Sequence, residues 1–174
     1  MDGVSQDERY KGAAVEFGPA LERLARAYEA DPDRRRDLLQ DIHLALWRSL
    51  AGFDGRCSLR TWVYRVADNA AASYVLQRRR AGAARLTSLE ELELPDVSAS
   101  PEDAAGAQQL LDRLRAMIRT LKPPDAQVML LYLEDLDAAA IGEVTGLSAA
   151  AVATKIHRIK SVLAKRFHDQ GASR

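Results

Sequence analysis

The residues with the clearest chemical character lie in one short stretch, FDGRCSLRTWVYRVADN, at positions 53–69. It combines an Asp-Gly turn with three aromatic and three arginine side chains. Aromatic rings stack on unpaired bases, contributing about 1–3 kcal/mol per base, and arginines neutralise the backbone. An asparagine or a loop group can contact the edge of a base that has left the stack. The stretch therefore indicates a surface for unstacked nucleic acid.

The same stretch has a second interpretation, because its aromatic residues recur at helical spacing. Trp62, Val66 and Ala70 share one helical face, and Trp47 aligns with apolar neighbours upstream. We therefore expect both tryptophans to act mainly as core residues. The arginines, Asn69 and the loop remain free to contact a ligand.

Charge is segregated along a chain whose formal net charge is zero, with 25 basic and 25 acidic residues. Residues 48–85 hold eight arginines and two acids, and residues 153–174 hold six basic residues and one acid. Residues 86–109 hold six acids and no Lys or Arg. Two basic regions separated by an acidic segment are typical of bipartite binding to a polyanion.

A second motif, residues 137–160, has the order of a helix-turn-helix. Asp137 can cap a short helix, Gly146 suits a sharp turn, Leu147 fills the corner, and Ser148 can cap the next helix. The polar face of that second helix is where a DNA-binding helix contacts the major groove. The candidate contacts are Ser148, Thr154, Lys155, His157, Arg158 and Lys160. The alternative is an ordinary helical hairpin, and the alanines at 149–151 and 153 offer base edges only apolar contact.

The residues around these motifs favour helix, and almost no two-residue alternation is present. Pro19 is expected to open a first helix, Asp31 to cap a second, and Ser58 to cap a third. The helices of this first part are expected at 19–30, 32–52 and 58–80.

The sequence thus predicts an all-α fold of two small helical domains, residues 10–82 and 107–170. An acidic flexible linker, residues 83–106, joins them. The alternative for this segment is a short acidic helix packed on one domain. In the second domain a helix over 107–121 ends at a Lys-Pro-Pro break, and three further helical elements follow.

Other classes of protein are disfavoured. The single cysteine, Cys57, cannot form an internal disulfide, which is typical of a reducing compartment. The sequence shows no apolar run of membrane-spanning length and no secretory signal, so we expect a cytoplasmic protein. His43, His157 and His168 lack metal-ligand spacing, and no nucleophile triad or phosphate loop is present. We expect no metal, no cofactor and no enzymatic activity.

Two segments resemble parts of a known family, in the family's order. Residues 37–80, beginning DLLQDI and ending QRRR, resemble region 2 of the extracytoplasmic-function (ECF) sigma factors of bacterial RNA polymerase. Residues 121–167, beginning LKPPDAQ and ending AKRF, resemble their region 4, and the whole resemblance covers about residues 13–168. It implies an alternative sigma factor that binds core RNA polymerase and promoter DNA, both duplex and melted. It also implies an anti-sigma protein as a partner.

The resemblance also implies roles for particular residues. The family's polymerase-docking helix matches Asp37, Leu38, Gln40, Asp41, Leu44 and Trp47. The loop that receives a flipped base of the minus-ten promoter element matches Phe53, Asp54, Gly55, Arg56, Cys57 and Ser58, and Asn69 matches a position that recognises this element. The phosphates of that strand would be held by Arg60, Arg65, Arg78, Arg79 and Arg80. The minus-thirty-five element would be contacted by the helix-turn-helix residues from Ser148 to Lys160 named above.

Three features depart from the family pattern. Arg34, Arg35 and Arg36 stand where acids often precede the docking helix, which would alter its electrostatics toward polymerase. Asp68 places a negative charge beside Asn69 and would repel a nearby phosphate. The alanines of the second helix predict permissive minus-thirty-five recognition. They keep open a second hypothesis, a helical protein-protein interaction module with a degenerate helix-turn-helix.

Overall fold

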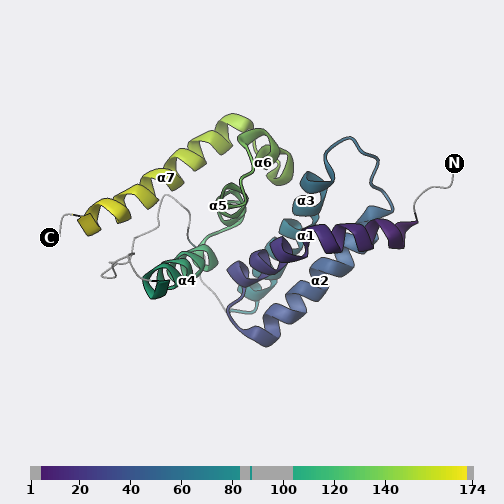
Figure 1. Ribbon diagram of the computed structural model, residues 1–174, viewed down its shortest axis with the longest axis horizontal. Coiled ribbons are helices and arrows are strands. Elements are labelled where there is room, and N and C mark those ends of the chain that lie inside the picture. The colour runs from purple at the N-terminus through teal and green to yellow at the C-terminus, as the bar shows by residue number, and fades with distance from the viewer. Residues whose placement is uncertain (1–4, 83–86, 88–103, 172–174) are drawn as a thin grey trace.

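The computed structural model describes residues 5–82, 87 and 104–171, which form seven helices (Figure 1). The first unit consists of α1 (Gln6–Tyr28), α2 (Pro32–Leu50) and α3 (Leu59–Arg80). The second consists of α4 (Ala104–Thr120), α5 (Asp125–Leu133), α6 (Ala138–Thr145) and α7 (Ala149–Gly171). The predicted all-α fold is confirmed for the described residues, whose only bridge is an isolated one between Thr87 and Leu121.

Helix α1 is much longer than the sequence analysis expected, and its predicted start at Pro19 was wrong. Ser5 and Glu8 form a reciprocal capping box. The Glu8 N–H donates to the Ser5 hydroxyl at 3.2 Å, and the Ser5 N–H donates to the Glu8 carboxylate at 2.9 Å. These bonds satisfy N–H groups that the first turn of a helix leaves unpaired. The helix therefore begins at Gln6, and Pro19 lies inside it.

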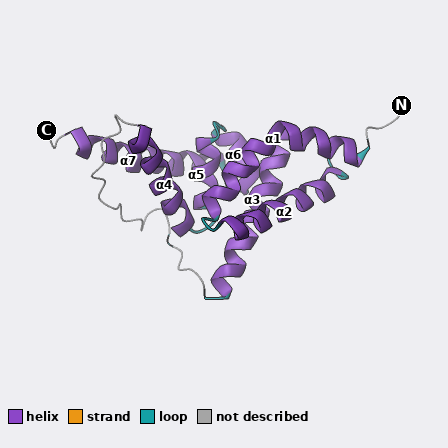
Figure 2. Cartoon of the chain, turned by 60° about the horizontal axis from the view of Figure 1, so that its bottom comes forward, coloured by secondary structure: helices purple, strands orange, loops and turns teal. Residues whose placement is uncertain are grey.

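The predicted caps of α2 and α3 are confirmed. The Asp31 carboxylate accepts the N–H groups of Asp33 and Arg34, and the Ser58 hydroxyl accepts that of Thr61 at 3.0 Å. Because α2 and α3 pack side by side, the loop between them lies at one end of the bundle. The start of α2 then lies beside the end of α3, whose last turns project from the other helices (Figure 2).

The first unit has a continuous apolar core. Every fourth residue of α2 is buried, in the series Leu38, Ile42, Leu46 and Leu50. Burying an aliphatic side chain of this size contributes about 1.5–3 kcal/mol. This stripe therefore fixes which face of α2 is turned inward and which face is left to solvent.

The second unit is built around α5, whose side chains are buried almost throughout. As predicted, Asp137 caps α6 and Gly146 ends it in the left-handed region, with a φ of 76°. Helix α7 packs through Val152 and Ile159, both fully buried. The side chains of Leu163 and Phe167, which continue the apolar spacing of this face in the sequence, lie outside the described residues.

The predicted linker falls mostly outside the described residues, so neither its flexibility nor the packed alternative is tested. Its last three residues, 104–106, belong to the first turn of α4. Thr87 pairs with the second unit, donating its N–H to Thr120 O at 2.7 Å and accepting the Lys122 N–H at 2.8 Å. Within the described ranges, a membrane-spanning length of apolar sequence is reached only by Ala138–Thr145 and Ala149–Val162 together, a pair bent by 111°.

Candidate nucleic-acid interface

The Asp-Gly loop borders a pocket at the start of α3. The pocket has a volume of about 410 Å³ and is lined by Arg9, Leu50, Phe53, Asp54, Gly55 and Leu59. Gly55 adopts a φ of 76°, a conformation open to glycine without steric cost. Phe53 packs edge-to-face on Trp62, with ring centroids 5.4 Å apart. A partly apolar pocket with charged residues in its lining suits a flat, polar-edged ring such as an extruded base.

The loop itself is held by local polar contacts. Arg56 donates its backbone N–H at 3.2 Å and its Nε at 2.5 Å to the Asp54 carboxylate, and these contacts hold the pKa of Asp54 below its ordinary value. Cys57 is half-buried and Ser58 caps α3. The structure thus brings the six predicted loop residues together around the turn.

The two tryptophans have different roles. Trp62 is half-buried and its Nε1 donates to the Ser49 hydroxyl at 3.1 Å, as expected for a packing residue. Trp47 is 39% exposed, so the prediction that it is mainly a core residue was wrong. Its Nε1 donates to the Asp7 carboxylate at 2.8 Å. The early start of α1 provides this polar partner and keeps the ring at the surface.

The outer face of α2 combines acidic and apolar side chains. Asp37, Gln40 and Asp41 are exposed, and the large apolar residues Leu44 and Trp47 are 43% and 39% exposed. Exposed apolar area rimmed by charge is typical of a protein interaction surface. Leu38, by contrast, is fully buried, so its part is to seat the helix on the core.

Two arginines predicted to hold DNA phosphates contact the second unit in the free chain. Arg60 donates its Nη2 to the backbone oxygen of Glu134, and Arg65 donates its Nε to the backbone oxygen of Glu143 at 3.0 Å. Asn69, on the same helix, is exposed. In this closed arrangement the two guanidinium groups are engaged by carbonyls of α5 and α6.

Glu134, at the end of α5, joins the two units. Its carboxylate accepts Arg23 Nε at 2.7 Å, Arg23 Nη2 at 2.6 Å and the Tyr64 hydroxyl at 2.9 Å. The Arg23 hydrogen bond is the main reason that the pKa of Glu134 lies below its ordinary value. Burial and the bond to Glu134 raise the pKa of Tyr64 to about 12. No local sequence pattern indicates this role of Glu134, because its partners lie 70 and 111 positions away.

Asp68 does not present the charge that the sequence analysis expected beside Asn69. Its side chain is 0% exposed, and neither carboxylate oxygen has a hydrogen-bond partner among the described residues. Burial, with a smaller contribution from Glu134, raises the pKa of Asp68 well above its ordinary value. Burial favours the neutral form of this carboxyl and keeps it away from the surface beside Asn69.

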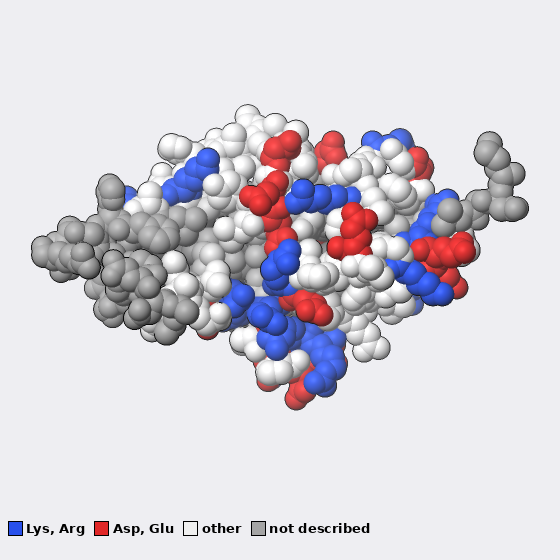
Figure 3. All heavy atoms as spheres, in the orientation of Figure 1, with Lys and Arg blue, Asp and Glu red and all other residues white. Residues whose placement is uncertain are grey.

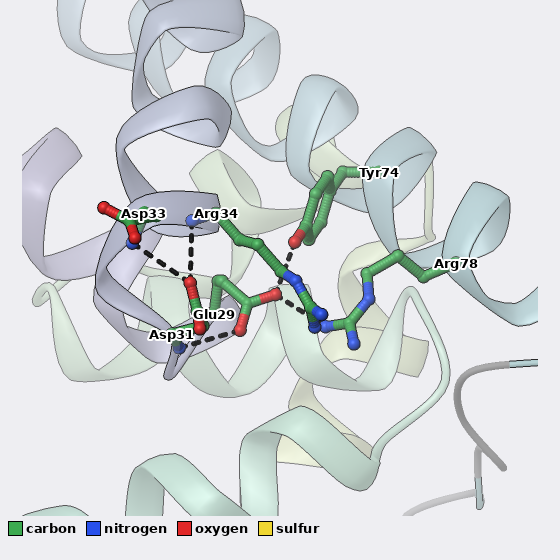
Figure 4. A network of polar contacts seen from close by, with 6 residues as sticks. All are labelled: Glu29, Asp31, Asp33, Arg34, Tyr74 and Arg78. Atoms are coloured by element: carbon green, nitrogen blue, oxygen red, sulfur yellow. Dashed lines mark hydrogen bonds and ion pairs between the residues drawn. The ribbon is translucent and has the colours of Figure 1, made fainter.

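Arg78 is also held by protein groups, because it belongs to a partly buried polar network (Figure 4). The Glu29 carboxylate accepts Arg78 Nη1 at 2.5 Å, the Tyr74 hydroxyl and the Asp31 N–H. Burial raises the pKa of Glu29, but these bonds and the charges of Arg78 and Arg34 outweigh it and hold the pKa below its ordinary value. Arg79 and Arg80 remain exposed.

Replacing Tyr74 by phenylalanine is expected to lower the free energy of unfolding by about 1.5 kcal/mol, because a hydrogen bond to a charged group is lost. Urea unfolding would measure this change. The control is Tyr132→Phe, since the Tyr132 hydroxyl bonds no described residue and its ring lies 5.6 Å from Lys160 Nζ. Equal stability of the Tyr74→Phe variant and the wild type would contradict a stabilising role for the network.

The helix-turn-helix forms as predicted, and it presents only part of its predicted face. Thr154, His157 and Arg158 are exposed on α7. Lys155 is paired with the buried Asp125 of α5, which ties the second helix to the domain. Lys160 lies over the Tyr132 ring, and the Ser148 hydroxyl accepts the Ala151 N–H at 3.2 Å. Ser148 and Lys160 stay exposed while making these contacts, so Lys155 is the one predicted contact that is half-buried.

The close approach of α6 and the turn requires a glycine. A Cβ added to Gly142 would lie 2.9 Å from the backbone oxygen of Leu147. Gly142→Ala is expected to destabilise the protein by about 1–3 kcal/mol through overpacking. The control Gly12→Ala adds a methyl group on α1 with nothing within 4 Å, and should be neutral or stabilising. Urea unfolding of both variants tests this, and equal behaviour would contradict the close packing.

No group of three His, Cys, Asp or Glu side chains in the described ranges is arranged to hold a metal ion. The candidate interfaces described above offer a pocket, exposed polar residues and cationic side chains. Their chemistry is binding of bases, phosphates and protein surfaces.

Comparison with known protein families gives two matching profiles, one for each helical unit, in the order of the chain. The sequence profile of Sigma-70 region 2 matches residues 14–81, and that of Sigma-70, region 4 matches residues 111–163. The ECF RNA polymerase sigma factor SigW of Bacillus subtilis is 28% identical, covering 76% of this chain and 75% of SigW. SigG of Mycobacterium tuberculosis is 30% identical, covering 73% of this chain and 40% of SigG. The structure of CnrH in complex with the cytosolic domain of CnrY shares the fold, with a TM-score of 0.64 at 20% identity over 94% of this chain and 90% of that chain.

Proposed function

Because this chain belongs to the ECF sigma factors of the sigma-70 family, we propose that it directs RNA polymerase to specific promoters through three surfaces. One surface docks on polymerase, one captures melted DNA and one contacts duplex DNA. The observation that carries the proposal is the presence, in family order, of a region 2 with a base-sized pocket and a region 4 with a helix-turn-helix. As in the family generally, the role is binding rather than catalysis.

The outer face of α2 is the proposed polymerase-docking surface. Exposed Leu44 and Trp47 supply apolar area, and Asp37, Gln40 and Asp41 supply polar contacts around it. Leu38 contributes by holding α2 on the core. Removing such apolar anchors from an interface typically has larger effects than removing rim charges.

The pocket beside the Asp-Gly loop is the proposed site for an extruded base of the minus-ten element. Phe53 and Leu50 provide apolar lining, and Asp54 and Arg9 provide polar groups that can contact a base edge. Asn69, Arg60 and Arg65 would contact the same strand. The last two must first exchange the carbonyls of Glu134 and Glu143 for phosphates, so DNA binding requires α3 to separate from the second unit.

The exposed face of α7 is the proposed contact with the minus-thirty-five element. Thr154, His157 and Arg158 can reach base edges or phosphates, whereas Lys155 is held by Asp125. The exposed alanines at 149, 150 and 153 support permissive recognition. They also favour the second candidate, a protein-protein interaction module, for which DNA affinity would be absent or insensitive to salt.

A protein that holds the factor inactive is a further proposed partner. The solved neighbour CnrH is bound to the cytosolic domain of CnrY. The shared fold supports an anti-sigma protein that would stabilise the closed arrangement of the two units.

The experiment that tests the function is a titration against core RNA polymerase, followed by promoter DNA. We expect tight polymerase binding and opening of at least one genomic promoter, detected by permanganate reactivity of unpaired thymines. Asn69→Ala should abolish opening and leave polymerase binding intact, and the control Lys11→Ala, at an exposed position of α1, should change neither. Failure to bind polymerase would overturn the proposal and favour the interaction module.

A further inference from the structure

The arginine run that departs from the family pattern lies on a larger basic surface. The first turns of α2 meet the last turn of α3, at the end of the first unit opposite the base pocket. Basic side chains gather on this lower part of the molecule (Figure 3). Arg26 of α1 joins Arg35 and Arg36 in lining one groove of about 230 Å³ between α1 and α2. We name Arg34, Arg35, Arg36, Arg79 and Arg80 the helix-end surface.

Glu29 fixes the two halves of this surface against each other. It accepts the Asp31 N–H at 2.9 Å, just before α2, and Arg78 Nη1 at 2.5 Å, near the end of α3. In Figure 4 the side chains of Arg34 and Arg78 approach the same carboxylate from these two helices. The arginines of α2 and α3 are therefore held together by the fold.

The surface is unfavourable for the folded protein by itself. Cations in the first turns of a helix oppose its dipole, at a cost of about 0.3–1 kcal/mol each. The nearby acids offset this cost only in part. Glu29 pairs with Arg78, Asp33 pairs with Arg36 at 3.3 Å, and the Asp31 carboxylate near Arg34 and Arg35 is already engaged in the cap. Among the described residues, Arg34, Arg35, Arg79 and Arg80 have no ion-pair partner. Unfavourable local electrostatics of this kind are typical of a functional surface. The positive charge of this surface suits a polyanion.

We propose that the helix-end surface binds the phosphate backbone of duplex promoter DNA adjoining the melted segment. This rests on the proposed function. Helix α3 has 22 residues and spans about 33 Å, so the surface lies roughly that far from the base pocket. The distance corresponds to about ten base pairs of duplex. A short melted stretch seated in the pocket ends before this point, and the continuing duplex supplies the phosphates.

The test uses the full chain bound to core polymerase, with a forked promoter DNA as the probe. Arg34→Ala combined with Arg35→Ala should lower the salt slope of the binding constant by about two, since each phosphate contact contributes roughly 0.9. The loss of DNA affinity in the double variant should be the same for every promoter sequence. Lys11→Ala should leave the slope unchanged. On DNA truncated to remove the adjoining duplex, the wild type and the double variant should bind equally.

An unchanged slope would overturn the proposal, and so would loss of polymerase affinity alone, which would assign these arginines to the protein partner. Failure of the wild-type complex to bind any promoter would instead overturn the proposed function. Removing cations from the start of α2 relieves their repulsion from the helix dipole and removes the attraction of Arg34 to Glu29, so the melting temperature should change little. If the Arg34→Ala, Arg35→Ala variant fails to fold, the Arg79→Ala, Arg80→Ala variant must lower the salt slope by the same amount for the proposal to stand.

Discussion

Replacing Glu134 by alanine is expected to raise the affinity of the free chain for single-stranded minus-ten DNA by about ten- to a hundredfold. The change removes the carboxylate that accepts Arg23 and Tyr64 across the two units. A hydrogen bond to a charged group contributes about 1.5–3 kcal/mol, and the half-exposed Arg23 pair adds less than about 1 kcal/mol. Because 1.4 kcal/mol is tenfold in an equilibrium constant, the ratio of closed to open chains should fall by about ten- to a hundredfold.

Fluorescence anisotropy with labelled DNA would measure the affinity, and small-angle scattering would measure the radius of gyration. The matched control is Glu143→Ala. It removes an exposed acid from the same unit, yet keeps the backbone oxygen that accepts Arg65. The Glu134 variant should bind more tightly and be more expanded than the control. Unchanged affinity and unchanged size would show that the carboxylate does not restrain the closed state.

This prediction follows from two ligands competing for the same guanidinium groups. Arg60 and Arg65 donate to carbonyl oxygens in the closed chain and are proposed to donate to phosphates on DNA. A phosphate is the stronger acceptor because the hydrogen bond becomes charge-assisted on both sides. DNA therefore shifts the chain toward the open state, by the difference in free energy between these two kinds of hydrogen bond. Any group that stabilises the closed state opposes this shift.

The parts of the fold that were predicted correctly depend on neighbouring residues. Asp31, Ser58 and Asp137 cap helices that start one position later, and Gly146 ends a helix by its own conformational freedom. Such signals are complete within a few positions of sequence. The Ser5 capping box is equally local and could have been found, since Glu8 stands three positions on.

The parts that were not predicted depend on contacts between distant segments. Trp47 and Leu38 are both apolar residues of α2, and periodicity alone did not show that one is exposed and the other buried. The contacts of Glu134 and the capture of Arg60 and Arg65 arise only when region 4 packs on α3. Arg34–Arg36 were recognised as unusual, but their position beside Arg79 and Arg80 needed the fold.

Asp68 gives the second large prediction, a stability that falls as pH rises. In the unfolded chain its carboxyl ionises near the ordinary pKa of 3.8, whereas burial raises the pKa well above that value in the folded protein. Between the two pKa values the folded state holds one more proton. The free energy of unfolding attributable to Asp68 is therefore fully present below pH 3.8 and falls by about 1.4 kcal/mol per pH unit as pH rises toward the folded pKa.

Asparagine at position 68 does not ionise, so the stability of Asp68→Asn relative to the wild type should rise with pH. The rise should be about 1.4 kcal/mol per pH unit while the pH lies between the unfolded and the folded pKa of Asp68. Urea unfolding at several pH values measures the difference. Asp41→Asn, which removes the same charge at an exposed position, provides the baseline. Asparagine keeps the shape of the side chain, so the trend with pH isolates ionisation from packing. A flat difference would mean that Asp68 is ionised in the folded protein, and the charge expected beside Asn69 would then return as an obstacle to DNA binding.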